Sequence, residues 1–236
     1  MNKIKLLIIA LCLILPIPAV ATGDWFTMAA GSGDSGGGCA TNTYTNLVVY
    51  SRDIPSGITA ANWAQSGTID ANYNQVGIEG ATNTASILTD NAGGAYESVQ
   101  QDIVIPNDSN VNVVRIFIGK DTIETRFPEI QFIMSGGGQV SCLVGFNTKT
   151  GATALRGGTP TLTVNSYNDN YWELLISLQN NSSGNTNARI VVLPALGILI
   201  GVANTSAVGS IIVGDVELYA NNSNANVSGI CPDYND

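Results

Sequence analysis

The spacing of short apolar runs is the feature that most constrains what this chain can fold into. After Thr45 such runs recur at intervals of about eight to twelve residues, the spacing of strands in a sandwich or barrel. Clusters such as "DNAGG", "SGGG" and "NNSSGNTN" separate them, and these residues favour turns. No stretch keeps a helical period over three turns. The sequence therefore predicts an all-β domain.

Side chains two residues apart in a strand lie on the same face, which divides each predicted strand into an inward and an outward set. The predicted strands span 45–51, 66–73, 85–90, 96–106, 111–120, 129–136, 140–146, 161–167, 171–179, 188–195 and 210–219. In 171–178, Trp172 shares a face with wholly apolar residues, so we expect Trp172 in the core and Tyr171 outside. The full inward set is Val99, Ile103, Ile105, Val114, Ile116, Ile118, Ile130, Phe132, Met134, Val140, Cys142, Val144, Phe146, Trp172, Leu174, Ile176 and Leu178.

The outward residues include aromatic rings and planar polar groups, the combination that binds sugars through their C–H faces and hydroxyl groups. The candidate ligand-binding residues are Tyr96, Gln100, Arg115, Phe117, Gln131, Tyr171 and Glu173. An ordinary solvated sheet face would have a similar composition, and the sequence does not say which of these residues share one of the two outer faces. Tyr73 and Tyr167, near predicted turns, offer a loop-tip site instead.

The first residues predict export. Lys3 and Lys5 precede the apolar stretch "LLIIALCLILPIP", and "AVA" follows as a small-residue cleavage site, so residues 1–21 have the pattern of a secretory signal peptide. The apolar run is short for a membrane anchor and contains two prolines. Leu11 stands before Cys12 where a lipoprotein signal has a small residue. We therefore expect a secreted or cell-surface protein.

The remainder of the chain divides into three parts. They are a flexible Gly/Ser-rich arm at residues 22–44, the β domain at residues 45–220, and a C-terminal tail at residues 221–236. Cys39 and Cys231 flank the domain, and the two ends of a compact domain often lie close together, so we expect these cysteines to form a disulfide that ties the tail back. An odd cysteine count leaves one thiol unpaired or bonded to another chain. Cys142, at an inward position, is expected to be a buried free thiol.

Composition limits the chemistry. The chain has no histidine, which excludes Ser-His-Asp triads, Cys-His pairs and His-ligated zinc. Its net charge of −9 argues against nucleic acid and anionic membranes as partners, and no segment after the signal peptide is long enough to insert into a membrane. Glu129 and Glu173 are the best pair of carboxylates for a glycosidase. Both are also explained as surface carboxylates, so we expect no enzyme.

Four stretches, in this order, resemble motifs of carbohydrate-binding-like jelly-roll domains that occur in phage tail and virion-associated proteins and in secreted glycosidases. They are "NLVVYSRDI" with "ANWAQSG" (46–67), "GFNTKTGA" (145–152), "YNDNYWELLISL" (167–178) and "GSIIVGDVELY" (209–219). The resemblance covers residues 45–220. It implies a jelly-roll β-sandwich of the galactose-binding or carbohydrate-binding-module type, with a binding role.

Modules of this kind often carry a structural calcium, which the resemblance implies as a cofactor. Calcium prefers oxygen ligands. The candidate ligands are Asp53, Asp90 and Asp215.

The sequence leads to two hypotheses of function. The first is a secreted, non-catalytic carbohydrate-binding or surface-attachment module whose partner is a surface glycan or polysaccharide. The alternative is a structural protein that self-associates into an extracellular filament or surface layer through its N-terminal arm. That arm carries Trp25 and Phe26, and an arm strand added to a neighbour's sheet edge is an established mode of assembly.

Overall fold

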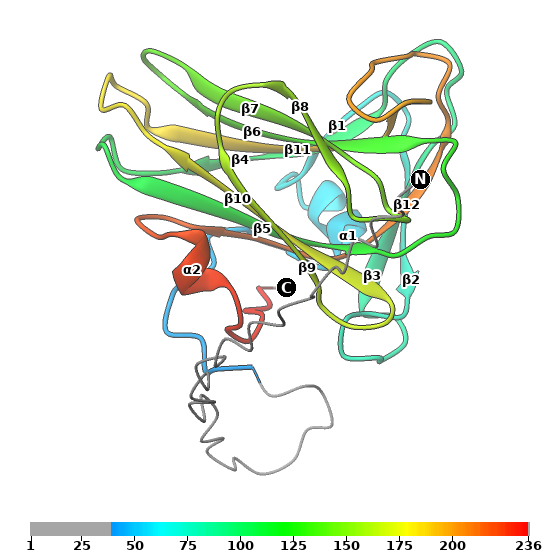
Figure 1. The fold of residues 1–236 in the computed structure, drawn as a ribbon, viewed down its shortest axis with the longest axis horizontal. Coiled ribbons are helices and arrows are strands. Elements are labelled where there is room, and N and C mark those ends of the chain that lie inside the picture. The colour runs from blue at the N-terminus through cyan, green and yellow to red at the C-terminus, as the bar shows by residue number, and fades with distance from the viewer. Residues whose placement is uncertain (1–38, 236) are drawn as a thin grey trace, which may run out of the picture. The chain divides into compact units, whose positions relative to one another are not determined.

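The strands form two antiparallel sheets that face each other, as the two layers of Figure 1 show. The computed structural model describes residues 39–235. In spatial order, the first sheet contains β1 (Ala64–Ser66), β4 (Ser98–Val104), β11 (Asn187–Gly197), β6 (Phe127–Ser135), β7 (Val140–Phe146) and β8 (Thr153–Gly157). The second sheet contains β2 (Asp70–Gln75), β3 (Ala85–Asp90), β12 (Gly209–Tyr219), β5 (Val111–Gly119), β10 (Tyr171–Gln179) and β9 (Thr161–Ser166). The two short helices are α1 (Ile54–Thr59) and α2 (Asn224–Val227).

The strand order identifies a jelly roll. Four central strands of the second sheet lie in the order β3-β12-β5-β10, and four of the first lie in the order β4-β11-β6-β7. Followed along the chain, these eight strands alternate between the sheets at every step except β6 to β7. Two interleaved Greek keys of this kind define the jelly-roll sandwich, so the predicted fold class is confirmed.

The core lies between the sheets and contains the inward residues that strand alternation predicts. All of them belong to one buried cluster or pack directly against it. Trp172 is one of the half-buried residues at its margin, where its indole Nε1 donates to the Thr148 carbonyl at 2.7 Å and Lys120 Nζ lies 4.6 Å from its ring centre. Trp172 therefore packs against the core, but at its margin rather than inside it as predicted.

The segment before the first strand differs from its prediction. Residues 45–51 form no strand. The segment is joined to β12 by two backbone hydrogen bonds, Leu47 to Leu218 and Val216 to Ser51, and by the Asn46 Oδ1, which accepts from the amides of Val48 and Leu218, each at 3.0 Å. The chain then enters α1, which the periodicity analysis missed. Asp53 caps this helix by accepting from the Ser56 amide at 3.0 Å, and Pro55 follows in the first turn, where its missing N–H costs no hydrogen bond.

The two ends of the domain are joined, as predicted. Cys39 and Cys231 form a disulfide, and Ala40 exchanges backbone hydrogen bonds with the C-terminal segment, donating to Gly229 and accepting from Cys231. The last six residues of the predicted arm, 39–44, therefore belong to the folded domain. The predicted signal peptide and the rest of the arm, including Trp25 and Phe26, lie outside the described residues. Neither helix in residues 39–235 has the length and apolar character needed to cross a membrane.

We predict that removing the disulfide destabilises the fold strongly, because it closes a loop with a sequence separation of 192 residues. The double variant Cys39→Ser/Cys231→Ser should lose about 2–5 kcal/mol of unfolding free energy, measured by urea denaturation. Cys142→Ala serves as the matched control for loss of a cysteine outside the disulfide. An unchanged denaturation midpoint in the double variant would contradict the structural role of this bond.

We predict that Cys142 is chemically inert in the folded protein. It is buried and unpaired, and burial raises the pKa of its thiol to about 12, whereas the thiolate is the reactive form. The folded, disulfide-bonded domain should show no reaction with a thiol reagent at pH 8, and Cys142 should react after unfolding in urea. Rapid labelling of the native protein would show that the core around Cys142 opens.

Candidate binding face

The outer face of the second sheet is covered by the C-terminal segment 220–235. Figure 1 shows this segment, which includes α2, lying against β5 and β10 on the side away from the first sheet. The buried residues of this contact are Val113, Leu175, Tyr219, Val227 and Ile230 in one cluster and Ile78, Phe117 and Tyr171 in another, against which Tyr167, Ile212 and Tyr234 pack. The part of this face formed by the central strands β5 and β10 is therefore closed to a ligand.

Arg115 stands at the centre of the covered face and is fully buried. Its Nε donates to Glu173 on β10 at 2.7 Å, and its Nη1 donates to Glu217 on β12 at 3.2 Å. The remaining Nη2 donates to the Ile230 carbonyl of the C-terminal segment at 2.9 Å. One guanidinium thus joins three neighbouring strands to the segment that covers them.

Carboxylates outnumber arginine at this position. Burial raises the pKa of Glu217, and the positive charge of Arg115 acts in the opposite direction. Asp215, two residues earlier on β12, is completely buried, and burial followed by the charge of Glu217 raises its pKa well above the usual range. Asp215 Oδ2 has no hydrogen-bond partner among the described residues. These features belong to a sealed ionic cluster rather than to an open site.

Four of the seven predicted ligand-binding residues are therefore placed wrongly with respect to solvent. Arg115, Phe117, Tyr171 and Glu173 do face away from the sandwich core, as alternation predicts, but each is at most 3% exposed. The tyrosine hydroxyl of Tyr171 donates to the Val76 carbonyl. The physical reason is the chain's return across this sheet, which alternation within a strand cannot show. Tyr167 is also engaged there, edge-on to Phe117 with ring centres 4.8 Å apart.

The other three predicted residues share the outer face of the first sheet. Strand register places Gln100 on β4 and Gln131 on β6 opposite the same residue, Val191 of β11, so one row runs across three strands. Tyr96 lies two residues before β4 and packs against the buried cluster of Val191, Leu193 and Leu196. Gln100, Gln131 and Tyr96 are all half-buried, which leaves part of each side chain to solvent.

Glu129 holds the polar side chains of this face in place. It is fully buried, and its Oε1 accepts from Gln131 Nε2 at 2.8 Å. Arg156 Nε on β8 lies 3.1 Å from the second oxygen, Oε2, in a direction that does not satisfy hydrogen-bond geometry. Burial raises the pKa of Glu129, while the Gln131 hydrogen bond and the charge of Arg156 lower it.

A second ion pair lies farther along the same face. Arg189 on β11 donates from Nε and Nη2 to the two oxygens of Asp102 on β4, each at 2.8 Å. We use the name first-sheet face for the surface formed by Tyr96, Gln100, Asp102, Glu129, Gln131, Arg156 and Arg189. Val191 and Leu193 are buried directly beneath it.

Sequence reasoning missed both arginines of this face. Arg156 lies in "TALRG", which follows a predicted turn and was not assigned to a strand, although β8 pairs with β7 there. Arg189 stands next to the apolar run of β11, and alternation with Ile190 would have placed it outside the core. The signal for Arg189 was therefore present in the sequence, and the one for Arg156 was weak.

The predicted calcium ligands do not form one site. Asp53 caps α1, Asp215 lies in the covered cluster, and Asp90 sits at the far end of β3, opposite Gly209. Since Gly209 and Asp215 are six residues apart on β12, the two aspartates are separated by about 20 Å. Within residues 39–235 no group of three metal-ligating side chains is arranged to hold an ion. These three aspartates therefore do not fit a shared calcium.

Glu129 and Glu173 do not form a catalytic pair. Glu129 faces outward from the first sheet and Glu173 outward from the second, so the sandwich core, about 10 Å thick between the sheets, separates them. Glycosidase mechanisms place both carboxyl groups on one substrate at about 5–10 Å. This arrangement is incompatible with joint action on a single bond.

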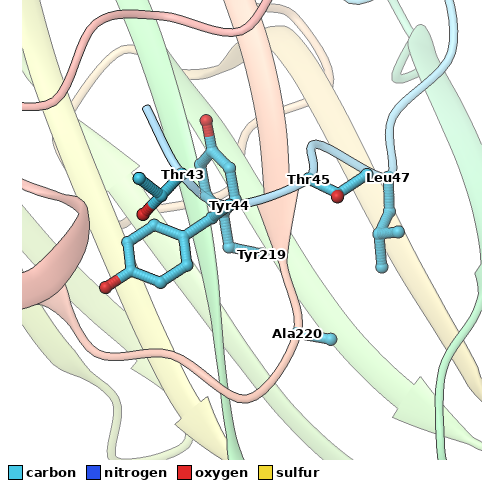
Figure 2. A pocket seen from close by; sticks show the side chains of 6 residues that line it. All are labelled: Thr43, Tyr44, Thr45, Leu47, Tyr219 and Ala220. Atoms are coloured by element: carbon cyan, nitrogen blue, oxygen red, sulfur yellow. The ribbon is translucent and has the colours of Figure 1, made fainter. Parts of the chain in front are cut away.

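A pocket of about 300 Å³ opens where the N-terminal segment passes β12 (Figure 2). Its lining consists of Thr43, Tyr44, Thr45, Leu47, Tyr219 and Ala220. The rings of Tyr44 and Tyr219 meet edge-on with centres 6.4 Å apart, and Tyr44 is the more exposed of the two. The pocket has no amide or charged side chain, so it offers fewer groups for hydroxyl recognition than the first-sheet face.

Comparison with known proteins gives similarity at the level of structure. No family model matches the chain, and no curated protein matches it in sequence. Similar solved structures include the enzymatically active domain of tailspike protein 4 of bacteriophage CBA120, with 16% identity, a TM-score of 0.43 and coverage of 74% of this chain but only 21% of the tailspike chain. The carbohydrate esterase of Shiga toxin-encoding bacteriophage phi24B has 12% identity, a TM-score of 0.43 and coverage of 76% and 100%.

A third similar structure is the module TmCBM61 in complex with β-1,4-galactotriose, with 13% identity, a TM-score of 0.39 and coverage of 75% of this chain and 99% of the module. Carbohydrate-binding and phage proteins are the classes whose motifs the sequence resembles.

We predict that the Arg115 cluster is essential for stability. Arg115→Met leaves the buried carboxylates of Glu173 and Glu217 without their counterion and should cost about 3–5 kcal/mol of unfolding free energy. Arg189→Met is the control, because the Arg189–Asp102 pair is exposed and should contribute at most about 1 kcal/mol. Equal losses of unfolding free energy in the two variants, measured by urea denaturation, would contradict the claim that the buried pairs of Arg115 contribute more to stability than the exposed pair of Arg189.

Proposed function

We propose that this chain is a secreted, non-catalytic carbohydrate-binding module that attaches to a surface glycan through its first-sheet face. The observation that carries the proposal is the contrast between the two outer faces. The centre of the second sheet is covered by segment 220–235, whereas the first sheet keeps Tyr96, Gln100 and Gln131 partly accessible on one surface.

The chemistry of the first-sheet face suits a sugar ring. Tyr96 offers the exposed part of an aromatic ring to sugar C–H groups and rests on the buried apolar cluster that contains Val191 and Leu193. Gln100 and Gln131 present amides that both donate to and accept from hydroxyl groups. Because Glu129 already fixes Gln131, that amide loses little conformational freedom when it binds.

The absence of catalysis and the secreted location are part of the same proposal. The first-sheet face has one buried carboxylate, Glu129, and its exposed carboxylate, Asp102, is fully engaged by Arg189. The Cys39–Cys231 disulfide suits an oxidising compartment, and residues 1–21 have the pattern of a signal peptide. A protein that binds a surface glycan without cleaving it can serve as an attachment module.

We predict that substitutions on the first-sheet face weaken glycan binding without unfolding the protein. Gln131→Ala and Tyr96→Ala should each reduce the affinity for a bound glycan by about tenfold, since each removes roughly 1–1.5 kcal/mol of contact. The experiment screens the exported protein on a glycan array and measures the positive glycans by isothermal titration calorimetry.

Tyr44→Ala is the matched control, because it removes a tyrosine from the pocket at β12 instead. Affinity that falls for Tyr44→Ala and stays constant for Tyr96→Ala would move the site to that pocket. A protein that binds no glycan on the array, and shows no hydrolysis of them either, would contradict the proposed function itself.

A further inference from the structure

The charges of the first-sheet face cancel in pairs. Arg189 is bound by both oxygens of Asp102, and Arg156 lies against the buried carboxylate of Glu129. These two arginines are the basic residues that the face contains, and each is matched by one acid. The face therefore presents no unpaired charge to a ligand, on a chain whose net charge is −9.

The two pairs differ in how they are built. Asp102 and Arg189 are similarly exposed, with side-chain exposures of 44% and 40%. In the other pair Glu129 is 0% exposed while Arg156 keeps 26% of its side-chain surface in solvent. The acid thus lies below the surface where no ligand reaches it, and only the guanidinium is presented. A guanidinium has five N–H donors, so the exposed part of the Arg156 side chain can still donate to a ligand.

We propose that Glu129 is a specificity-determining residue that masks the charge of Arg156, so that the first-sheet face selects neutral glycans over acidic ones. This inference rests on the proposed glycan-binding function and names its ligand class. A neutral sugar can accept hydrogen bonds from the guanidinium of Arg156 through its hydroxyl oxygens. A uronate carboxylate at the same place would form a bidentate pair with Arg156 but would also meet the field of Glu129 directly behind it.

The rest of the face strengthens the same selection. Asp102 stands on the surface and accepts hydrogen bonds from Nε and Nη2 of Arg189, so the charge of Arg189 is already balanced by a carboxylate. No other cation of the face is available to balance a polyanion. An acidic polysaccharide therefore gains no compensating charge and is repelled by the excess of carboxylates on the protein as a whole.

The test compares neutral and acidic polymers on two forms of the exported protein. The probes are β-1,4-galactan and β-1,4-mannan as neutral polymers and polygalacturonate and alginate as acidic ones. The wild-type protein should bind at least one neutral polymer and neither acidic polymer. Glu129→Gln keeps the size of the side chain and an acceptor for Gln131 but removes the negative charge behind Arg156. This variant should raise the affinity for an acidic polymer by about ten- to a hundredfold.

Two further variants separate masking from general charge. Glu124→Gln changes the net charge by the same amount and removes the carboxylate that lies 3.3 Å from Lys149 in an exposed pair. Neither residue is among the seven that define the first-sheet face, so this variant should leave acidic polymers unbound. The double variant Glu129→Gln/Arg156→Gln should lose the gain made by Glu129→Gln. The gained binding should also weaken as NaCl rises from 50 to about 500 mM, because screening shortens the range of charge interactions.

The outcomes distinguish the two proposals. Wild-type protein that binds acidic polymers as tightly as neutral ones overturns the selection by Glu129 and leaves glycan binding intact. A folded Glu129→Gln variant without any gain for acidic polymers also overturns it. If Glu129→Gln fails to fold, the wild-type comparison alone decides. If neither form binds any of the four polymers, the selection of neutral glycans proposed here is contradicted. The glycan array then tests separately whether the protein binds glycans at all.

Discussion

The buried contact between Arg115 and the C-terminal segment determines which side of this sandwich can serve a ligand. Arg115 joins β5, β10 and β12 through Glu173 and Glu217, and its last donor reaches the Ile230 carbonyl. A buried charge without a partner would cost several kcal/mol of folding free energy, and a buried ion pair without further hydrogen bonds would contribute little to stability. Here all three donor directions are used, and the neighbouring disulfide at Cys231 holds the segment in place.

As a consequence, the two outer faces of the sandwich have different properties. Both sheets have six strands and both contribute to one core, yet one outer face is packed with side chains and the other is left with amides and paired charges. On the open face a buried carboxylate, Glu129, organises Gln131 and Arg156 from below. Buried ionic groups thus have two different roles here. One seals a surface, and the other sets the properties of the surface that remains.

Local patterns predicted the sandwich well, because strand alternation reports burial within a strand. The inward residues of five strands were placed in the core for this reason, and Cys39 with Cys231 followed from the proximity of domain ends. The site was predicted only in part. Tyr171 and Arg115 were assigned correctly to an outer face, but whether a face is open depends on contacts between residues far apart, such as Arg115 with Ile230, which leave no periodic signal. Arg156 was missed because its short edge strand follows a turn and has little apolar character.

The most direct test of this account is to map a bound glycan on the protein by NMR, using a neutral oligosaccharide that the array identifies and amide chemical shifts assigned for the whole domain. The account predicts that the shifts change along β4, β6 and β11, with the largest effects near Gln100, Gln131 and Tyr96, and that Tyr171 and the strands around Arg115 stay unchanged. Changes centred on β5, β10 and the C-terminal segment would show that the covered face opens to ligand, and would contradict the central claim.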